Sequence, residues 1–148
     1  MRIGIASDHR GYKEKEELKK LLDKYEIIDY GTYSEEIIDY PKYAFLLSEG
    51  VLKKEVDLGI ILCGTGIGVS IACNKVKGIR CAKIDSVSDA KSAKEHNDAN
   101  ILAFGADRHN AIDIMEMVET FINSTFNTTP RYKMRIEQVE KYEETNEY

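Results

Sequence analysis

The sequence predicts an α/β fold: a doubly wound, five-stranded parallel sheet in a Rossmann-like three-layer sandwich, with an additional C-terminal helix. Its 148 residues suffice for a single domain spanning residues 1–148, with one ordinary core. Short runs of apolar residues alternate along the chain with longer segments that carry helical apolar spacing. This alternation is typical of parallel strands joined by right-handed helical crossovers.

Five short apolar runs are expected to form the strands. The strongest covers residues 57–62, where Leu58-Gly-Ile-Ile-Leu62 is uninterrupted, as expected for a parallel strand buried on both faces. The other four runs cover residues 2–7, 26–30, 79–84 and 100–104.

Six segments are predicted to be helices because their apolar residues recur on one face. The clearest covers residues 111–122, with Ile114, Val118 and Phe121 on that face. The others cover residues 11–24, 42–54, 68–74, 87–95 and, after a polar hinge, 130–142. The acidic tail 143–148 is expected to fray.

Composition narrows the class of protein. The formal net charge of −5 argues against a nucleic-acid partner, which usually requires a basic face. No apolar run is long enough for a membrane span, and Met1-Arg2 leads directly into a strand rather than a secretory segment. Three cysteines without an export signal indicate reduced thiols, so a cytoplasmic protein is expected.

A glycine-rich run follows the strongest strand and opens a helix. Gly64, Gly66 and Gly68 are spaced two apart, with Thr65 and Ile67 between them. Glycines at such a turn expose backbone N–H groups at the positive end of a helix, which favours an anion. A plain turn needs fewer glycines, so we interpret the run as a ligand site.

Known anion-binding motifs fit this run only in part. A Walker loop requires lysine where Thr65-Gly66 stands, and a cysteine phosphatase requires arginine where Val69 stands. A dinucleotide fingerprint fits better, with Asp85 as the ribose acid, although the third glycine falls one place early. A nucleotide-binding or regulatory module therefore remains an alternative.

Cys63 precedes the glycines and is the candidate reactive group. A helix N-terminus stabilises a thiolate, which could attack a carbonyl or take a proton from carbon while N–H groups hold the resulting oxyanion. A buried structural cysteine is the usual alternative, and we accept it for Cys73 and Cys81.

Other polar groups follow strand ends or helices. Asp8 and His9 end the first strand, where His9 could place a titratable imidazole at the ligand site and Asp8 could hold it or contact hydroxyls. Alternatively, Asp8 could cap the first helix. His96-Asn97 follows a helix, and His109 is expected at the surface. No histidine or cysteine spacing indicates a metal. Arg131 and Arg135 lie one helical turn apart, a geometry that can clamp phosphate.

The sequence resembles the type B ribose-5-phosphate isomerases and the related galactose-6-phosphate and allose-6-phosphate isomerases over nearly its whole length. The motifs that carry the resemblance are Ile5-Ala-Ser-Asp-His-Arg-Gly11, Asp39-Tyr-Pro41, Cys63-Gly-Thr-Gly-Ile-Gly68, Ala72-Cys-Asn-Lys75, Gly78-Ile-Arg80, Glu95-His-Asn-Asp-Ala-Asn100, Ala103-Phe-Gly105 and the segment 131–135. The cysteine–glycine and His-Asn-Asp-x-Asn blocks form a highly specific pair.

The resemblance implies an aldose–ketose isomerase of the pentose phosphate pathway that converts ribose 5-phosphate without metal or cofactor. A six-carbon sugar phosphate is the same-class alternative. It implies a homodimer, with a tetramer as the further possibility, whose sites are shared between subunits. The implied catalytic residues are Cys63 as base, Thr65, His96 as ring-opening acid/base, and Asp8. The implied substrate-binding residues are His9, Tyr40, Gly64, Gly66, Ile67, Gly68, Asn97, Arg131 and Arg135.

Two departures from the family pattern fall at the phosphate end. Asp107, with Arg108 after it, stands where the family often has arginine, and Thr129-Pro-Arg-Tyr132 replaces Gly-Gly-Arg-His. These positions bear on the length of the sugar that the chain accepts. Some relatives use a glutamate at the start of the following helix as the base, and Val69 excludes that route here.

Overall fold

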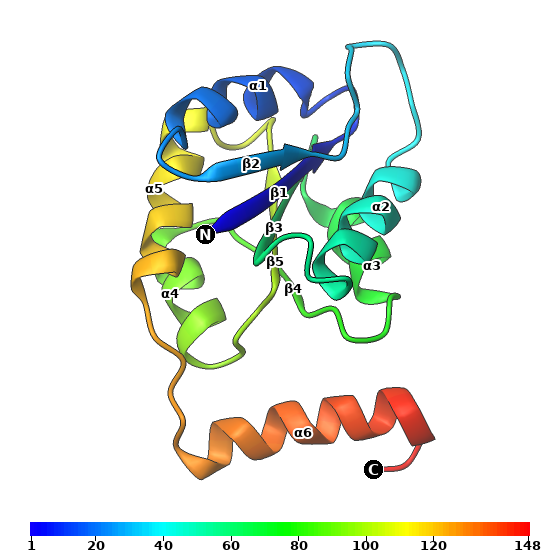
Figure 1. Cartoon of the computed structure of the whole chain (residues 1–148), viewed down its shortest axis with the longest axis vertical. Helices are drawn as coiled ribbons and strands as arrows, with labels where there is room; N and C mark the ends of the chain where they lie inside the picture. The colour runs from blue at the N-terminus through cyan, green and yellow to red at the C-terminus, as the bar shows by residue number, and fades with distance from the viewer.

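The computed structural model describes residues 1–148 and contains one parallel sheet of five strands (Figure 1). The strand order is β2-β1-β3-β5-β4, and every neighbouring pair is parallel. The bounds are β1 (Arg2–Ser7), β2 (Glu26–Asp29), β3 (Leu58–Cys63), β4 (Cys81–Lys83) and β5 (Ile101–Gly105). The predicted fold class is confirmed.

Helices cover both faces of the sheet (Figure 1). On one face lie α1 (Tyr12–Leu21), α4 (Val87–Glu95) and α5 (Ala111–Asn123). On the other face lie α2 (Pro41–Leu52) and α3 (Ile67–Asn74). No helix is both long and apolar enough to cross a membrane.

The alternation of side chains along β3 divides the core. Leu58, Ile60 and Leu62 pack on the face of α1, α4 and α5, whereas Ile61 and Cys63 pack on the face of α2 and α3. Successive side chains of a strand point to opposite faces, so the position of Cys63 at the end of β3 aims its thiol toward α2 and α3.

The last helix, α6 (Pro130–Thr145), lies apart from the three layers (Figure 1) and buries none of its residues. Arg80 Nη1 lies 3.1 Å from Glu140 Oε1, and Gly78 N–H donates to Glu143 Oε2 at 3.1 Å. The prediction of a frayed tail from residue 143 is wrong for 143–145, because the contact with Gly78 holds Glu143 and a left-handed Asn146 caps the last helical turn.

Strand β4 is shorter than the predicted 79–84. Arg80 N–H donates to the side-chain Oδ1 of Asn100 at 2.8 Å, and Cys81 N–H donates to Asn74 Oδ1 at 2.8 Å. Side-chain acceptors thus replace the backbone ladder at the start of this edge strand. The apolar pattern alone contained no sign of this exchange.

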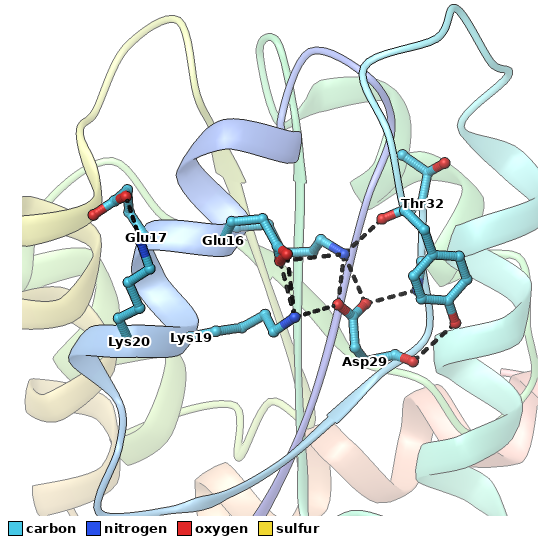
Figure 2. A network of polar contacts seen from close by, with 9 residues as sticks. Glu16, Glu17, Lys19, Lys20, Asp29 and Thr32 are labelled. Carbon is cyan, nitrogen blue, oxygen red and sulfur yellow. Dashed lines mark hydrogen bonds and ion pairs between the residues drawn. The ribbon is translucent and has the colours of Figure 1, made fainter.

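Lysine side chains of α1 contact the carboxylate of Asp29 at the end of β2, as Figure 2 shows for Lys19. Lys15 is 0% exposed, and its Nζ lies 2.7 Å from Asp29 Oδ1 and 2.6 Å from the carbonyl oxygen of Thr32. Burial alone would raise the pKa of Asp29, but hydrogen bonds from Lys15 and Lys19 outweigh it and leave that pKa below its ordinary value. The network fixes the start of the loop 31–40, which leads to Tyr40.

Candidate active site

The carboxyl ends of β1, β3 and β5 lie side by side in the middle of the sheet. Ser7 is in register with Leu62, and Cys63 with Gly105. The turns that follow these strands therefore meet at one edge, which is where open parallel sheets bind ligands. They carry Asp8 to Arg10, Cys63 to Gly68, and Ala106 with Asp107.

Cys63 is 5% exposed, and its sulfur lies within the turn that begins α3. Gly66 N–H donates to Cys63 Sγ at 3.1 Å. This contact requires the chain to reverse at Gly66, whose φ of 77° lies in the left-handed region that favours glycine. The sulfur thus has a backbone donor and the N-terminal end of α3 beside it.

The other two glycines of the run allow side chains to approach closely. A Cβ on Gly64 would lie 2.2 Å from Arg10 Cζ, and one on Gly68 would lie 2.7 Å from Tyr40 Cζ. Between them Thr65 Oγ1 accepts from the N–H of Ile67 at 3.1 Å. The interpretation of the run as a closely approached turn is consistent with these contacts.

Asp8 and His9 face this edge from β1. Asp8 is 5% exposed, and its Oδ1 accepts from the N–H groups of Arg10 and Gly11 at 2.9 and 3.1 Å. These bonds close the turn before α1 and do not cap the helix, whose N-cap is Gly11 without a side-chain capping bond. Asp8 Oδ2 makes no protein hydrogen bond. His9 Nδ1 lies 3.2 Å from both the N–H and the carbonyl oxygen of Ile38, so Nε2 is left for a ligand.

Tyr40 comes from the loop above the sheet and stands at the N-cap of α2. Its hydroxyl oxygen lies 3.0 Å from the Cβ position of Gly68. Pro41 begins α2 with a fixed φ, which sets the direction of the chain at Tyr40. Cys63, the glycine run, Asp8, His9 and Tyr40 are thus brought together.

The remaining predicted residues lie at the opposite edge of the sheet. His96 and Asn97 precede β5, and the carbonyl oxygen of Asn97 accepts from Arg80 Nε at 3.0 Å beside the start of β4. From Gly59 to Cys63 the paired strands β3 and β5 rise about 13 Å. Arg131 and Arg135 join His96 through Tyr132, whose ring they flank at 4.8 and 5.9 Å. Within one chain these residues do not reach Cys63.

Two expectations about other polar residues need correction. His109 is not a free surface residue: its side chain is 16% exposed, and Nε2 lies 3.1 Å from Asp85 Oδ1. Asp85 also pairs with Lys83, and hydrogen bonds first from Lys83 and then from His109 lower its pKa. An aspartate engaged in this way is poorly suited to hold a ribose hydroxyl.

Cys73 and Cys81 differ in burial. Cys73 is 0% exposed and is a buried residue as expected, whereas Cys81 is only half-buried. A hydrogen bond with Cys81 lowers the pKa of the Cys73 thiol, and the same bond raises that of Cys81. No group of three or more side chains is arranged to hold a metal ion.

Sequence reasoning assigned no role to three residues that contact predicted site residues. Arg10 and Asp107 form an ion pair at Gly64, and Tyr132 stacks on His96. Arg10 follows the predicted Asp8-His9 pair, and Asp107 stands at a departure from the family pattern, so both were visible in the sequence. Their contact was not, because it joins positions 97 residues apart.

Comparison with known proteins identifies the family of this chain. The ribose/galactose isomerase family model matches residues 3–139. The chain belongs to the ribose/galactose isomerase family. Over 97% of both chains it is 37% identical to ribose-5-phosphate isomerase B of Escherichia coli. Over 99% of both it is 44% identical to YwlF of Bacillus subtilis, which is named as a sugar phosphate isomerase without a stated sugar.

Solved structures of this isomerase family share the fold. Ribose-5-phosphate isomerase B of Clostridium thermocellum superposes with a TM-score of 0.95 at 41% identity, covering 99% of this chain and 100% of that one. The Mycoplasma genitalium enzyme, solved with bound ribulose-5-phosphate, gives a TM-score of 0.91 at 35% identity over 97% of both chains. The chain is therefore a sugar phosphate isomerase of this type, and the nucleotide-binding alternative is set aside.

Proposed function

We propose that this isomerase interconverts ribose 5-phosphate and ribulose 5-phosphate through a cis-enediolate, with Cys63 as the base. The observation that carries the proposal is the hydrogen bond from Gly66 N–H to Cys63 Sγ at 3.1 Å. It supports the proposal because it places the Cys63 sulfur beside backbone N–H groups of the kind that stabilise an enediolate. The names of the relatives support the substrate, since several are ribose-5-phosphate isomerases B.

In this mechanism the Cys63 thiolate takes the proton from C2 of the opened aldose and returns it to C1. The electron pair left on carbon moves into an enediolate, whose charge the N–H groups of the run Gly64–Gly68 stabilise. Thr65 passes the other proton between the oxygens on C1 and C2, so the sugar neither gains nor loses atoms. Such positioned proton transfer contributes about 10²- to 10⁴-fold to a rate.

The same proposal assigns the other predicted residues. Asp8, Tyr40 and Asn97 hold sugar hydroxyls, and Ile67 contributes its backbone to the cradle. His9, Arg131 and Arg135 hold the phosphate, and His96 opens the ring.

Because His96, Asn97 and the two arginines lie at the far edge of the sheet, they would complete the site of a second copy in a homodimer. Apolar side chains exposed on α2 and α3 support such an interface, among them Phe45 at 42% and Ile71 at 55% exposed. On this proposal the enzyme acts in the pentose phosphate pathway of the cytoplasm, where its three free cysteines stay reduced.

A coupled isomerase assay on ribose 5-phosphate tests the base. Cys63→Ala should lower kcat by at least about 100-fold while the midpoint of thermal unfolding stays near that of the wild type. Cys73→Ala removes an equally buried thiol away from the glycine run and should keep its kcat. Wild-type turnover by the Cys63→Ala protein would exclude Cys63 as the base.

The six-carbon alternative rests on Asp107 and the Pro130-Arg-Tyr132 segment, which depart from the family pattern at the phosphate end. Measurement of kcat/KM for ribose 5-phosphate, allose 6-phosphate and galactose 6-phosphate decides between a five-carbon and a six-carbon substrate. We expect the five-carbon substrate to be preferred by at least about tenfold. A higher kcat/KM for either hexose phosphate would reassign the substrate.

A further inference from the structure

The side chain of Arg10 lies directly over the first glycine of the run. A Cβ on Gly64 would be 2.2 Å from Arg10 Cζ and 2.5 Å from both Nε and Nη1. The guanidinium plane therefore packs on Gly64, the residue that follows the proposed base. At the other end of the run the ring of Tyr40 packs on Gly68 in the same manner, so a cation and an aromatic ring bracket the glycines.

Both ends of Arg10 are held in place. Its backbone N–H donates to Asp8 Oδ1 at 2.9 Å, and its Nη2 pairs with the carboxylate of Asp107. Asp107 is itself fixed on the run, because its N–H donates to the carbonyl oxygen of Gly64 at 3.0 Å. The guanidinium is thus pre-positioned at the site rather than free in solvent, which reduces the entropy lost when it binds a ligand.

Stability does not account for this arrangement. The side chains of Arg10 and Asp107 are 52% and 48% exposed, and ion pairs this exposed contribute little to the free energy of unfolding. A guanidinium carries five N–H donors in a planar fork, and Asp107 engages only Nη2. The remaining donors have no hydrogen-bond partner in the protein and are available to a ligand at this end of the glycine run.

These observations point to an anionic oxygen as the missing partner. A guanidinium fork binds the oxygens of a phosphate monoester in pairs. Arg10 directly follows His9, whose Nε2 is also left for a ligand. The enediolate already has backbone donors near Cys63 Sγ, whereas at this edge of the chain Arg10 is the permanently charged side chain packed on the glycine run.

We infer that Arg10 is a substrate-binding residue that grips the phosphate group of the sugar, with Asp107 holding its guanidinium over Gly64. The inference rests on the proposed function only in naming the phosphate as part of an aldose phosphate. It gives Arg10 and Asp107 a joint role, in which the cation comes from the turn after β1 and the carboxylate from the turn after β5.

Titration of inorganic phosphate by calorimetry, combined with steady-state kinetics on ribose 5-phosphate, tests this role. In Arg10→Ala we expect the Kd for phosphate and the KM for the sugar phosphate to rise at least about tenfold, with kcat within about threefold of the wild type. In Arg10→Lys both constants should lie between those of the wild type and of Arg10→Ala, since lysine keeps the charge and loses the planar fork of donors. Lys20→Ala removes the same charge from an exposed face of α1 and should change neither constant.

Unchanged phosphate Kd and KM in a folded Arg10→Ala protein would overturn the inference. A fall in kcat at constant KM would also overturn it, because Arg10 would then act at the reacting carbons. If Arg10→Ala does not fold, Arg10→Gln keeps the stem over Gly64 and gives the same reading. The phosphate titration needs no turnover, so a wild type inactive on every aldose phosphate would refute the proposed function and leave this inference to the titration alone.

Discussion

Tyr132 stacks on His96, with ring centroids 4.8 Å apart and the two planes parallel. Arg131 Nη2 donates to the hydroxyl oxygen of Tyr132 at 3.0 Å, and both Arg131 and Arg135 lie over its ring. One tyrosine thus holds together the three charged or titratable residues proposed to enter the site of a second copy. Because α6 buries none of its residues, core packing does not fix the direction of its first turns. The stack of Tyr132 on His96 contributes to that orientation.

Removal of the Tyr132 ring should therefore impair the enzyme more than removal of its hydroxyl. We expect Tyr132→Ala to lower kcat/KM about tenfold, because His96 and both arginines lose their support. Tyr132→Phe keeps the stacked ring and should stay within about threefold of the wild type. Steady-state kinetics on both variants checks this, and equal losses would show that the hydroxyl, not the stack, is what matters.

Gly66 and Gly64 should differ sharply when each is replaced by alanine. In Gly66→Ala the new Cβ would meet the carbonyl carbon of Phe104 at 2.9 Å at a φ of 77°, so we expect the free energy of unfolding to fall by about 2 to 3 kcal/mol. In Gly64→Ala the clash is with the half-exposed guanidinium of Arg10. That side chain can shift into solvent at the cost of one exposed ion pair, so the loss should stay below about 1 kcal/mol. Urea unfolding measures both values, and equal losses would refute the distinction.

The buried Lys15–Asp29 pair makes a pH-dependent contribution to stability. The pKa of Asp29 lies below its ordinary value in the folded protein, whereas in the unfolded chain it is about 3.9. The folded state then binds fewer protons, so the pair's stabilisation is complete above the unfolded pKa and is lost as the pH falls through the lower folded value.

Lys15→Met should therefore cost about 3 kcal/mol of unfolding free energy at pH 7, and the difference from the wild type should shrink as the pH falls below about 4. Lys20→Met is the matched control, since that lysine is 73% exposed and pairs with Glu17. It should differ from the wild type by less than about 0.5 kcal/mol. A loss for Lys15→Met that is independent of pH would mean that packing, not the ion pair, is responsible.

Residues whose positions follow from strand ends could be predicted from the sequence. The uninterrupted run of β3 fixes Cys63 at the carboxyl edge, and the end of β1 places Asp8 and His9 beside it, because neighbouring parallel strands end at the same edge. The Arg10–Asp107 pair could not be predicted, since it depends on the register of three strands. Nor could the His96–Tyr132 stack, which depends on the direction that α6 takes after a polar hinge.

The separation of Cys63 from His96 by the height of the sheet leads to the sharpest test of shared sites. If each site takes Cys63 from one subunit and His96 from its partner, then Cys63→Ala and His96→Ala are each inactive as pure dimers. Mixed dimers contain one site with both substitutions and one intact site. With equal amounts and random exchange, about half of the dimers are mixed, so activity should return to about a quarter of the wild-type value.

The two proteins are unfolded together in urea, refolded and assayed on ribose 5-phosphate, with each protein refolded alone as the control. Recovery in the mixture but in neither control supports the shared site. No recovery, in a mixture whose dimers are shown by sedimentation to have formed, would mean that each chain carries a complete site of its own.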